Sequence, residues 1–117
     1  MSIKYVNNYG KVTIDDSVIA NIACASVMSS YGVVGLASRS TKDGIYKLLG
    51  IHNMDRGVQI ERNIDGSVNV NISLILEYGV RIAVVCENII DNVKYNIEKS
   101  LNIGVSEVNI VVQGIRK

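Results

Sequence analysis

The chain has 117 residues, of which 48% are apolar and 20% charged, so its length and composition fit one globular domain and exclude a disordered or fibrous protein. Its 12 basic and 11 acidic side chains leave a net charge of +1, so no global field attracts nucleic acid or anionic lipid. Six tyrosines occur without phenylalanine or tryptophan, so we expect a core of valine, isoleucine and leucine.

The first predicted elements are a short strand and a helix. Residues 10–14, GKVTI, predict the strand, and Asp15 and Asp16 supply the N-cap and first-turn carboxylates of a helix that runs to about Ser30. Helical spacing predicts a core-facing stripe of Val18, Ile19, Ile22, Ala23 and Ser26. The opposite face is uncharged: Ala20, Cys24, Val27 and Met28. This helix is therefore either covered on both sides or offers an apolar strip to a partner.

A brief strand at residues 33–37, VVGLA, is followed by an irregular, basic segment at residues 38–56. Within that segment the apolar residues Ile45, Leu48 and Leu49 suit one or two helical turns. They alternate with four basic residues, Arg39, Lys42, Lys47 and Arg56. Such a mixture is suited to contact with RNA, an anionic membrane surface or a protein, and a solvated loop is the simpler interpretation.

Alternation and a tight IDGS turn predict a hairpin of residues 57–64 and 68–77. The helix that follows shows the strongest periodicity of the chain, with one apolar stripe: Ile82, Val85, Cys86, Ile89, Ile90, Val93, Ile97 and Leu101. A last strand, VSEVNIVVQG, begins at Val105. Both hairpin strands and the last strand keep one polar face.

These elements predict an α+β fold in a single domain spanning residues 1–117. Because both helices have faces suited to one sheet, we expect a two-layer sandwich with a mixed β-sheet of about four to five strands and two main helices on one face. The opposite sheet face is expected to be open and lined by amides and a few charges.

Catalytic patterns are weak. At the corner formed by Glu77, Tyr78, Gly79 and Arg81 the polar side chains are expected to diverge, and Gly79 is explained as a structural turn. An enzyme would require Glu77, Arg81 and the single histidine, His52, to share one pocket. Cys24 and Cys86 are expected to be buried free thiols without metal-ligand spacing. The sequence therefore predicts no catalytic residue, no metal and no cofactor.

Residues 17–38 carry no formal charge and have about the length of a membrane span. Serines, an asparagine and glycines dilute the segment, and a turn at Tyr31 and Gly32 divides it, so it favours a soluble fold. The N-terminus lacks the apolar region of a signal peptide. We predict a cytoplasmic protein whose contact with a membrane is at most peripheral.

Gly32 and Gly35 match the Gly-x-x-Gly loop with which KH domains clamp nucleotides. The two middle residues, Val33 and Val34, are apolar, and the preceding helix is uncharged, which argues against phosphate contacts. A nucleic-acid-binding module that uses residues 32–35 and the following basic segment is kept as the alternative function.

In their order and spacing, six blocks of the chain resemble the bacterial alkaline shock protein family, also called general stress or cell-envelope stress response proteins. The blocks are GKVTIDDSVIANIA, YGVVGLA, DGIYKLLG, GVQIE, LEYGVRIAVVCENIIDNVKYNIE and VSEVNIVVQGI. The best single markers are residues 108–114 and the Glu77-Tyr78-Gly79-Val80 turn.

The resemblance implies a small cytoplasmic protein that assembles with itself or its relatives and helps to maintain the cell envelope under stress. In some members a separate anchor protein holds it at the membrane, and the resemblance carries over no catalytic residues. The sequence and the resemblance together predict a non-enzymatic scaffold that makes contacts through Ala20, Cys24, Val27, Met28, Ile45, Leu48 and Leu49. Replacing Ala20 and Val27 with lysine is then expected to leave the fold intact and to lower the apparent mass.

Overall fold

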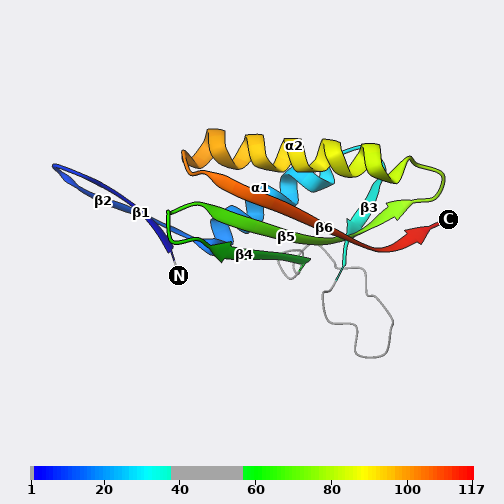
Figure 1. Cartoon of the computed structure of the whole chain (residues 1–117), viewed down its shortest axis with the longest axis horizontal. Helices are drawn as coiled ribbons and strands as arrows, with labels where there is room; N and C mark the ends of the chain where they lie inside the picture. The colour runs from blue at the N-terminus through cyan, green and yellow to red at the C-terminus, as the bar shows by residue number, and fades with distance from the viewer. Residues whose placement is uncertain (1, 38–56) are drawn as a thin grey trace, which may run out of the picture.

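The computed structural model describes residues 2–37 and 57–117, and Figure 1 shows how the elements are arranged. Two strands at the N-terminus, β1 (Ser2–Asn7) and β2 (Gly10–Asp15), precede helix α1 (Asp16–Met28). Three further strands follow: β3 (Val33–Leu36), β4 (Val58–Arg62) and β5 (Val68–Glu77). Helix α2 (Ile82–Leu101) and strand β6 (Val105–Arg116) complete the order.

Strand β5 is the centre of the main sheet. Strand β6 pairs with it in parallel over its whole length, from Val68 to Glu77. The other edge of β5 is shared by two antiparallel strands, with β4 opposite residues 68–72 and β3 opposite residues 74–76. The sheet is therefore mixed, as predicted, and only three strands wide at any level.

The central strand owes its position to its alternating sequence. Its helix-facing residues are fully buried: Val68, Val70, Ile72, Leu74 and Leu76. On α2 the predicted stripe buries Val85, Ile89, Val93 and Ile97 against them. Strand β5, helix α2 and the parallel strand β6 form one strand–helix–strand crossover unit. In such a unit the helix packs back onto the sheet that contains both strands.

Both helices lie on one face of the sheet, which confirms the predicted α+β sandwich (Figure 1). Helix α1 contacts β3 and β4, whereas α2 contacts β6. A polar contact joins the two helices, in which Asn96 Nδ2 donates to Ser26 Oγ at 2.8 Å and Ser26 Oγ donates to the Ile22 carbonyl at 2.8 Å. The buried hydroxyl is thereby satisfied in both roles.

The strand predicted at residues 10–14 is present but lies outside the main sheet. It is part of β2, which pairs antiparallel with β1 in a separate two-stranded ribbon that projects from the body (Figure 1). Lys11, Val12 and Thr13 are exposed. A strand without a buried stripe gains little from joining a packed sheet, so the local hairpin pairing prevails.

The predicted apolar strip on α1 is wrong. Ala20 is 5% exposed, Cys24 7% and Val27 0%, and only Met28 lies at the surface. The reason is that α1 packs against the sheet on one side and against α2 on the other. A helix covered on two flanks needs apolar residues around more than half of its circumference, so its uncharged second face belongs to the core.

Candidate interaction surface

The interaction residues predicted from the sequence do not form a surface in the described part of the chain. Ala20, Cys24 and Val27 are buried in the core, and Met28 stands alone at the end of α1. Ile45, Leu48 and Leu49 lie outside the described residues.

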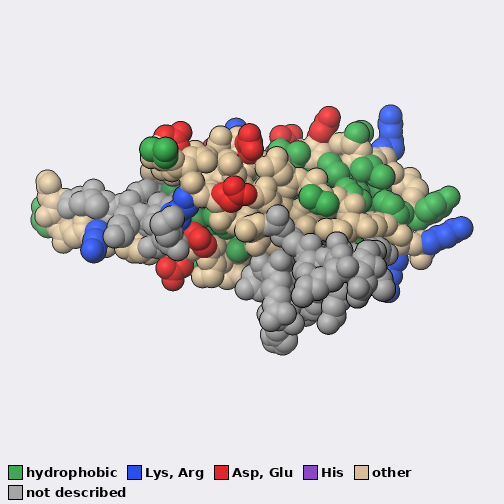
Figure 2. All heavy atoms as spheres, turned by 60° about the horizontal axis from the view of Figure 1, so that its bottom comes forward, with side chains coloured by type: hydrophobic (Ala, Val, Ile, Leu, Met, Phe, Trp, Pro, Cys, Tyr) green, Lys and Arg blue, Asp and Glu red, His purple; other side chains and the backbone are tan. Residues whose placement is uncertain are grey.

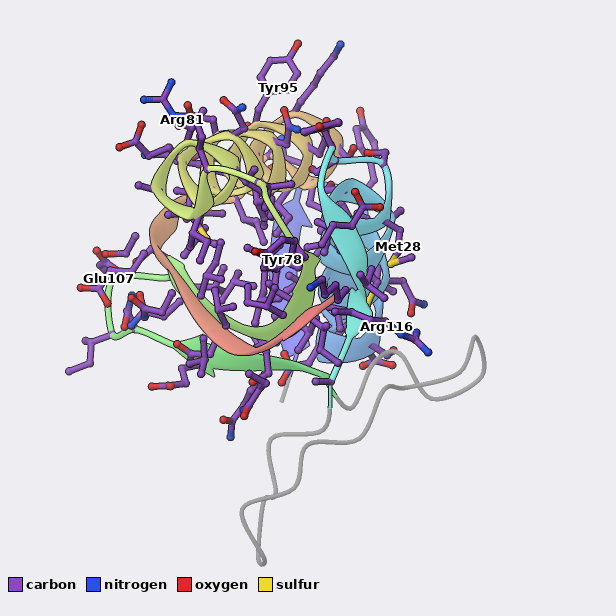
Figure 3. The ribbon with its side chains drawn as sticks, turned by 90° about the vertical axis from the view of Figure 1, so that its right-hand side faces the viewer. Met28, Tyr78, Arg81, Tyr95, Glu107 and Arg116 are labelled. Carbon is purple, nitrogen blue, oxygen red and sulfur yellow. The ribbon has the colours of Figure 1, made fainter. Side chains whose placement is uncertain are left out.

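The corner after β5 is a turn, as predicted. Gly79 has φ +89°, a conformation that favours glycine, and the turn leads from β5 into α2. Tyr78 is exposed beneath the Lys117 ammonium, whose Nζ lies 5.1 Å from the ring centroid. Arg81 projects from the start of α2, apart from Tyr78 (Figure 3). His52 lies outside the described residues, so the three-residue pocket is not placed.

The Gly-x-x-Gly segment is not a loop. Val33 and Gly35 pair with Leu76 and Ile75 of β5, so the segment is a turn residue followed by strand β3. Gly32 is buried with φ +86°, and its carbonyl accepts a hydrogen bond from the Glu77 amide at 2.8 Å. A phosphate-clamping loop needs free amides at its surface, so this geometry contradicts that part of the nucleic-acid alternative.

Gly32 is expected to be structurally essential. An alanine Cβ there would lie 3.2 Å from Val80 Cγ1 and 3.3 Å from Val85 Cγ2, whereas at Gly66, with φ +90°, no atom lies within 4 Å. We expect Gly32→Ala to lower the free energy of unfolding by about 2–3 kcal/mol and Gly66→Ala by about 1 kcal/mol. Urea denaturation of both variants measures the difference, and equal losses would contradict a role for the contact with Val80 and Val85.

The outer edge of β6 is a surface that the sequence pattern does not predict. Within residues 2–37 and 57–117 no strand pairs with this edge, although β6 is 12 residues long. Its pairing with β5 shifts register twice, which leaves Ser106 and Gln113 as extra residues on either side of a regular stretch. Unpaired amides and carbonyls along such a stretch are a template for another strand.

The opposite border of the sheet is a poorer template. Strand β4 has only five residues, and two of them, Glu61 and Arg62, are charged. Arg62 forms an ion pair with Asp16 of α1, which fastens this border to the helix layer. Short, charged strands are the usual protection of a sheet edge.

Apolar side chains flank the free edge on the helix side. Asn96 donates a hydrogen bond to α1, so its flank of α2 faces α1. At about 100° of rotation per residue, Cys86 and Ile90 lie on the other flank of α2. That flank lies over β6. Cys86 and Ile90 are half-buried, as are Ile110 and Val112 of β6. Ile82 and Ile115 are 44% and 39% exposed. We call these six residues the edge seam: Ile82, Cys86, Ile90, Ile110, Val112 and Ile115.

Figure 2 shows hydrophobic side chains gathered over the first half of α2 and the second half of β6. Burial in this apolar setting raises the pKa of the Cys86 thiol above its ordinary value, which disfavours the reactive thiolate. The seam thus presents an apolar surface in which the thiol of Cys86 favours its protonated form.

The face of the sheet away from the helices is polar over β4 and the first half of β5. Asn109 Nδ2 donates to Asn71 Oδ1 at 2.9 Å, and Asn71 Nδ2 donates to Glu61 Oε1 at 2.5 Å, so two amides and a carboxylate link three strands. Farther along β5, Ser73 and Ile75 are buried, so the prediction of a fully open face holds for only part of it.

Val111 interrupts the polar face. It is 52% exposed and occupies the β6 position opposite Ser73. The sequence contains one signal for this border. Residues 110–112, IVV, break the alternation of the last strand, because Val111 places an apolar residue on the polar side.

Among the residues that the structure describes, no helix combines the length and the apolar character needed to cross a bilayer. Residues 17–37, for which the sequence suggested a soluble fold, divide into α1, a turn and β3.

Comparison with known proteins gives a consistent result. The chain is 36% identical over 117 residues to the uncharacterized protein YloU of Bacillus subtilis (strain 168), covering 99% of this chain and 97% of that protein. It is 35% identical to the uncharacterized protein Spy1614 of Streptococcus pyogenes serotype M6, covering 99% of this chain and 96% of that protein. A second protein of that organism, the uncharacterized protein Spy1535, is 30% identical over 98% of this chain and 84% of its own length. No solved structure matches the chain.

A protein-family model, that of the alkaline shock protein 23 family, matches residues 4–117 and is described as having a cell envelope-related function. This match spans both helices and the whole main sheet. The chain therefore belongs to the alkaline shock protein 23 family, a family with a cell envelope-related function.

Proposed function

We propose that the protein is a non-enzymatic scaffold of the cell envelope, which acts from the cytoplasmic side by binding other proteins through the β6 edge and the edge seam. The observation that carries the proposal is the 12-residue edge of β6, unpaired within the described residues and bordered by half-exposed apolar side chains. The family's cell envelope-related function gives the setting.

The two parts of this surface suit a protein partner. An added strand satisfies the amides and carbonyls of the edge, and main-chain hydrogen bonds of this kind give affinity in strand addition. The seam supplies apolar area beside it, which gives the favourable free energy that exposed hydrogen bonds alone do not. Neither feature requires a group that makes or breaks covalent bonds.

The partners that we propose are further copies of the chain, related family members and a membrane anchor protein. Contact with the membrane itself is peripheral in this proposal. The near-neutral net charge of +1 supports protein contacts over a broad electrostatic attraction to lipid or nucleic acid.

The test is an Ile115→Lys substitution in the edge seam, compared with Ile64→Lys in the β4–β5 turn. Ile64 is fully exposed and lies outside the seam, so its substitution controls for the added charge. After crosslinking in the native cell, we expect Ile115→Lys to lose the crosslinked protein species and to make the cells as sensitive to envelope stress as a deletion. Native crosslinking and stress survival with Ile115→Lys would contradict the proposed surface.

A further inference from the structure

We infer that the free edge of β6 is occupied by the β6 strand of a second copy of this chain, paired antiparallel about a two-fold axis through Val111. The inference deepens the proposed function and rests on it, because it names one partner of the same surface. The result is one continuous sheet that crosses both protomers.

The position of the seam decides the direction of the axis. All six seam residues lie on the helix side of the β6 border. A partner strand covers them only if its own α2 lies on that same side, which requires a two-fold axis perpendicular to the sheet. In that arrangement residues opposite each other point to the same face, so β6 must be complementary to itself position by position.

The centre of pairing follows from the residues on β6. We number the pairing positions of β6 by the β5 residue opposite each of them. Gln113 is a bulge with no β5 residue opposite it, so it is not counted as a pairing position. With Val111 on the axis, the opposed pairs are Val111 with itself, Ile110 with Val112, Asn109 with Gly114, Val108 with Ile115 and Glu107 with Arg116. Apolar residues then meet apolar residues on the helix side, and opposite charges meet at both ends of the paired stretch.

Other centres lose the charge match. An axis through Ile110 places Glu107 opposite Gly114, and an axis through Val112 places Arg116 opposite Asn109. Glu107 and Arg116 lie toward the two ends of β6, and their side chains are exposed (Figure 3). Since opposite charges directly across a strand pair stabilise it and like charges destabilise it, this pair selects the register.

The neighbouring strands extend the same pattern. Arg116 lies beside Glu77 of β5 within one protomer, so the dimer would flank its guanidinium with carboxylates from both chains. Pairing would also bury Val111, which is half-exposed, against its own symmetry mate, and Ile115 against Val108. Charges on a solitary edge usually prevent pairing, whereas this arrangement makes them complementary.

Charge reversal tests the register. By symmetry Glu107→Arg replaces two attractive pairs with two repulsive ones, and we expect the dimer to weaken about tenfold or more. The double variant Glu107→Arg with Arg116→Glu restores opposite charges across the dimer but places a carboxylate beside Glu77, so we expect partial recovery, with binding at least about threefold tighter than that of Glu107→Arg alone. Sedimentation equilibrium over a range of concentrations measures all three proteins. A native chain that stays monomeric while soluble, or a double variant as weak as the single one, would overturn the inference.

A disulfide test places the axis. The pairing brings the two Cβ atoms at position 111 to about 4.5–5.5 Å, close to the separation that a disulfide needs. Under mild oxidation we expect Val111→Cys to form a disulfide-linked dimer joined at the substituted position, identified by mass spectrometry. The control, Gln59→Cys at an exposed position of β4, is expected to remain unlinked. Equal crosslinking of the two variants, or none at position 111, would refute the axis.

These outcomes separate the inference from the proposed function. If charge reversal leaves self-association unchanged while Ile115→Lys abolishes crosslinking in cells, the second-copy model fails and the surface keeps its function with another partner. If Ile115→Lys has no effect in cells but the register tests succeed, the dimer stands and the cellular role of the surface fails.

Discussion

The Val27→Lys substitution is expected to unfold the protein. Val27 is fully buried in the core on α1. An ammonium without a partner in such a site loses its hydration, and the pKa of a buried lysine falls by up to about 5 units, equivalent to about 7 kcal/mol. That is comparable with the whole stability of a small domain, about 5–15 kcal/mol. The expectation from the sequence alone, an intact fold of lower mass, is therefore reversed by the structure.

The loss should also depend on pH in a defined direction. Because the folded pKa of the introduced lysine lies below its unfolded value, the unfolded state binds more protons between the two values, and stability rises with pH over about pH 6 to 10. Met28→Lys is the matched control, since the neighbouring side chain is 40% exposed, and a change within about 0.5 kcal/mol is expected. Urea unfolding followed by circular dichroism at several pH values measures both. A native-like Val27→Lys protein would contradict the burial of α1's second face.

Leu74→Ala is expected to cost about 2–5 kcal/mol of unfolding free energy. Leu74 is fully buried on the central strand, between Leu36 of β3 and Val112 of β6, so a cavity there is enclosed by both borders of the sheet. The loss contains the transfer free energy of the removed carbons and the cost of a cavity that the packed strands cannot close.

Val12→Ala on the projecting ribbon is the control for Leu74→Ala, because Val12 is 57% exposed and a change within about 0.5 kcal/mol is expected. Guanidinium denaturation should give a lower midpoint for Leu74→Ala with an unchanged slope. A Leu74→Ala midpoint equal to that of Val12→Ala would show that β5 is not the centre of the core.

The sequence predicts buried residues best in elements that have one buried face and one solvent-exposed face. The alternation of β5 predicts its helix-facing buried residues, because period and burial are linked within a single element. Of the eight residues in the predicted α2 stripe, four are buried, three are half-buried and Ile82 is exposed at the start of the helix. The turn at Gly79 follows from the same local argument, since only the backbone conformation of that residue is involved.

The sequence pattern does not predict the packing partners of an element that is covered on two flanks, or of one that has no buried face. After Asp16, helix α1 carries no charge, and α2 and the sheet cover two of its flanks. The sequence alone leaves open whether its second apolar face meets the core or a partner. The sequence predicts the strand at residues 10–14 but not its partner β1, and in the structure this strand lies outside the main sheet. Both outcomes depend on which elements meet, which periodicity does not encode.

The sequence by itself determined the fold class, the core of β5 and α2, and the family resemblance, since each depends on residue order and on side-chain period. Only the tertiary structure decided that β3 and β4 share one border of β5 and that β6 leaves its own outer edge unpaired within the described residues. Strand pairing joins residues far apart in the chain, and every strand has the same backbone donors and acceptors on both edges. The free edge and its apolar seam therefore became visible only once the strands were placed in order.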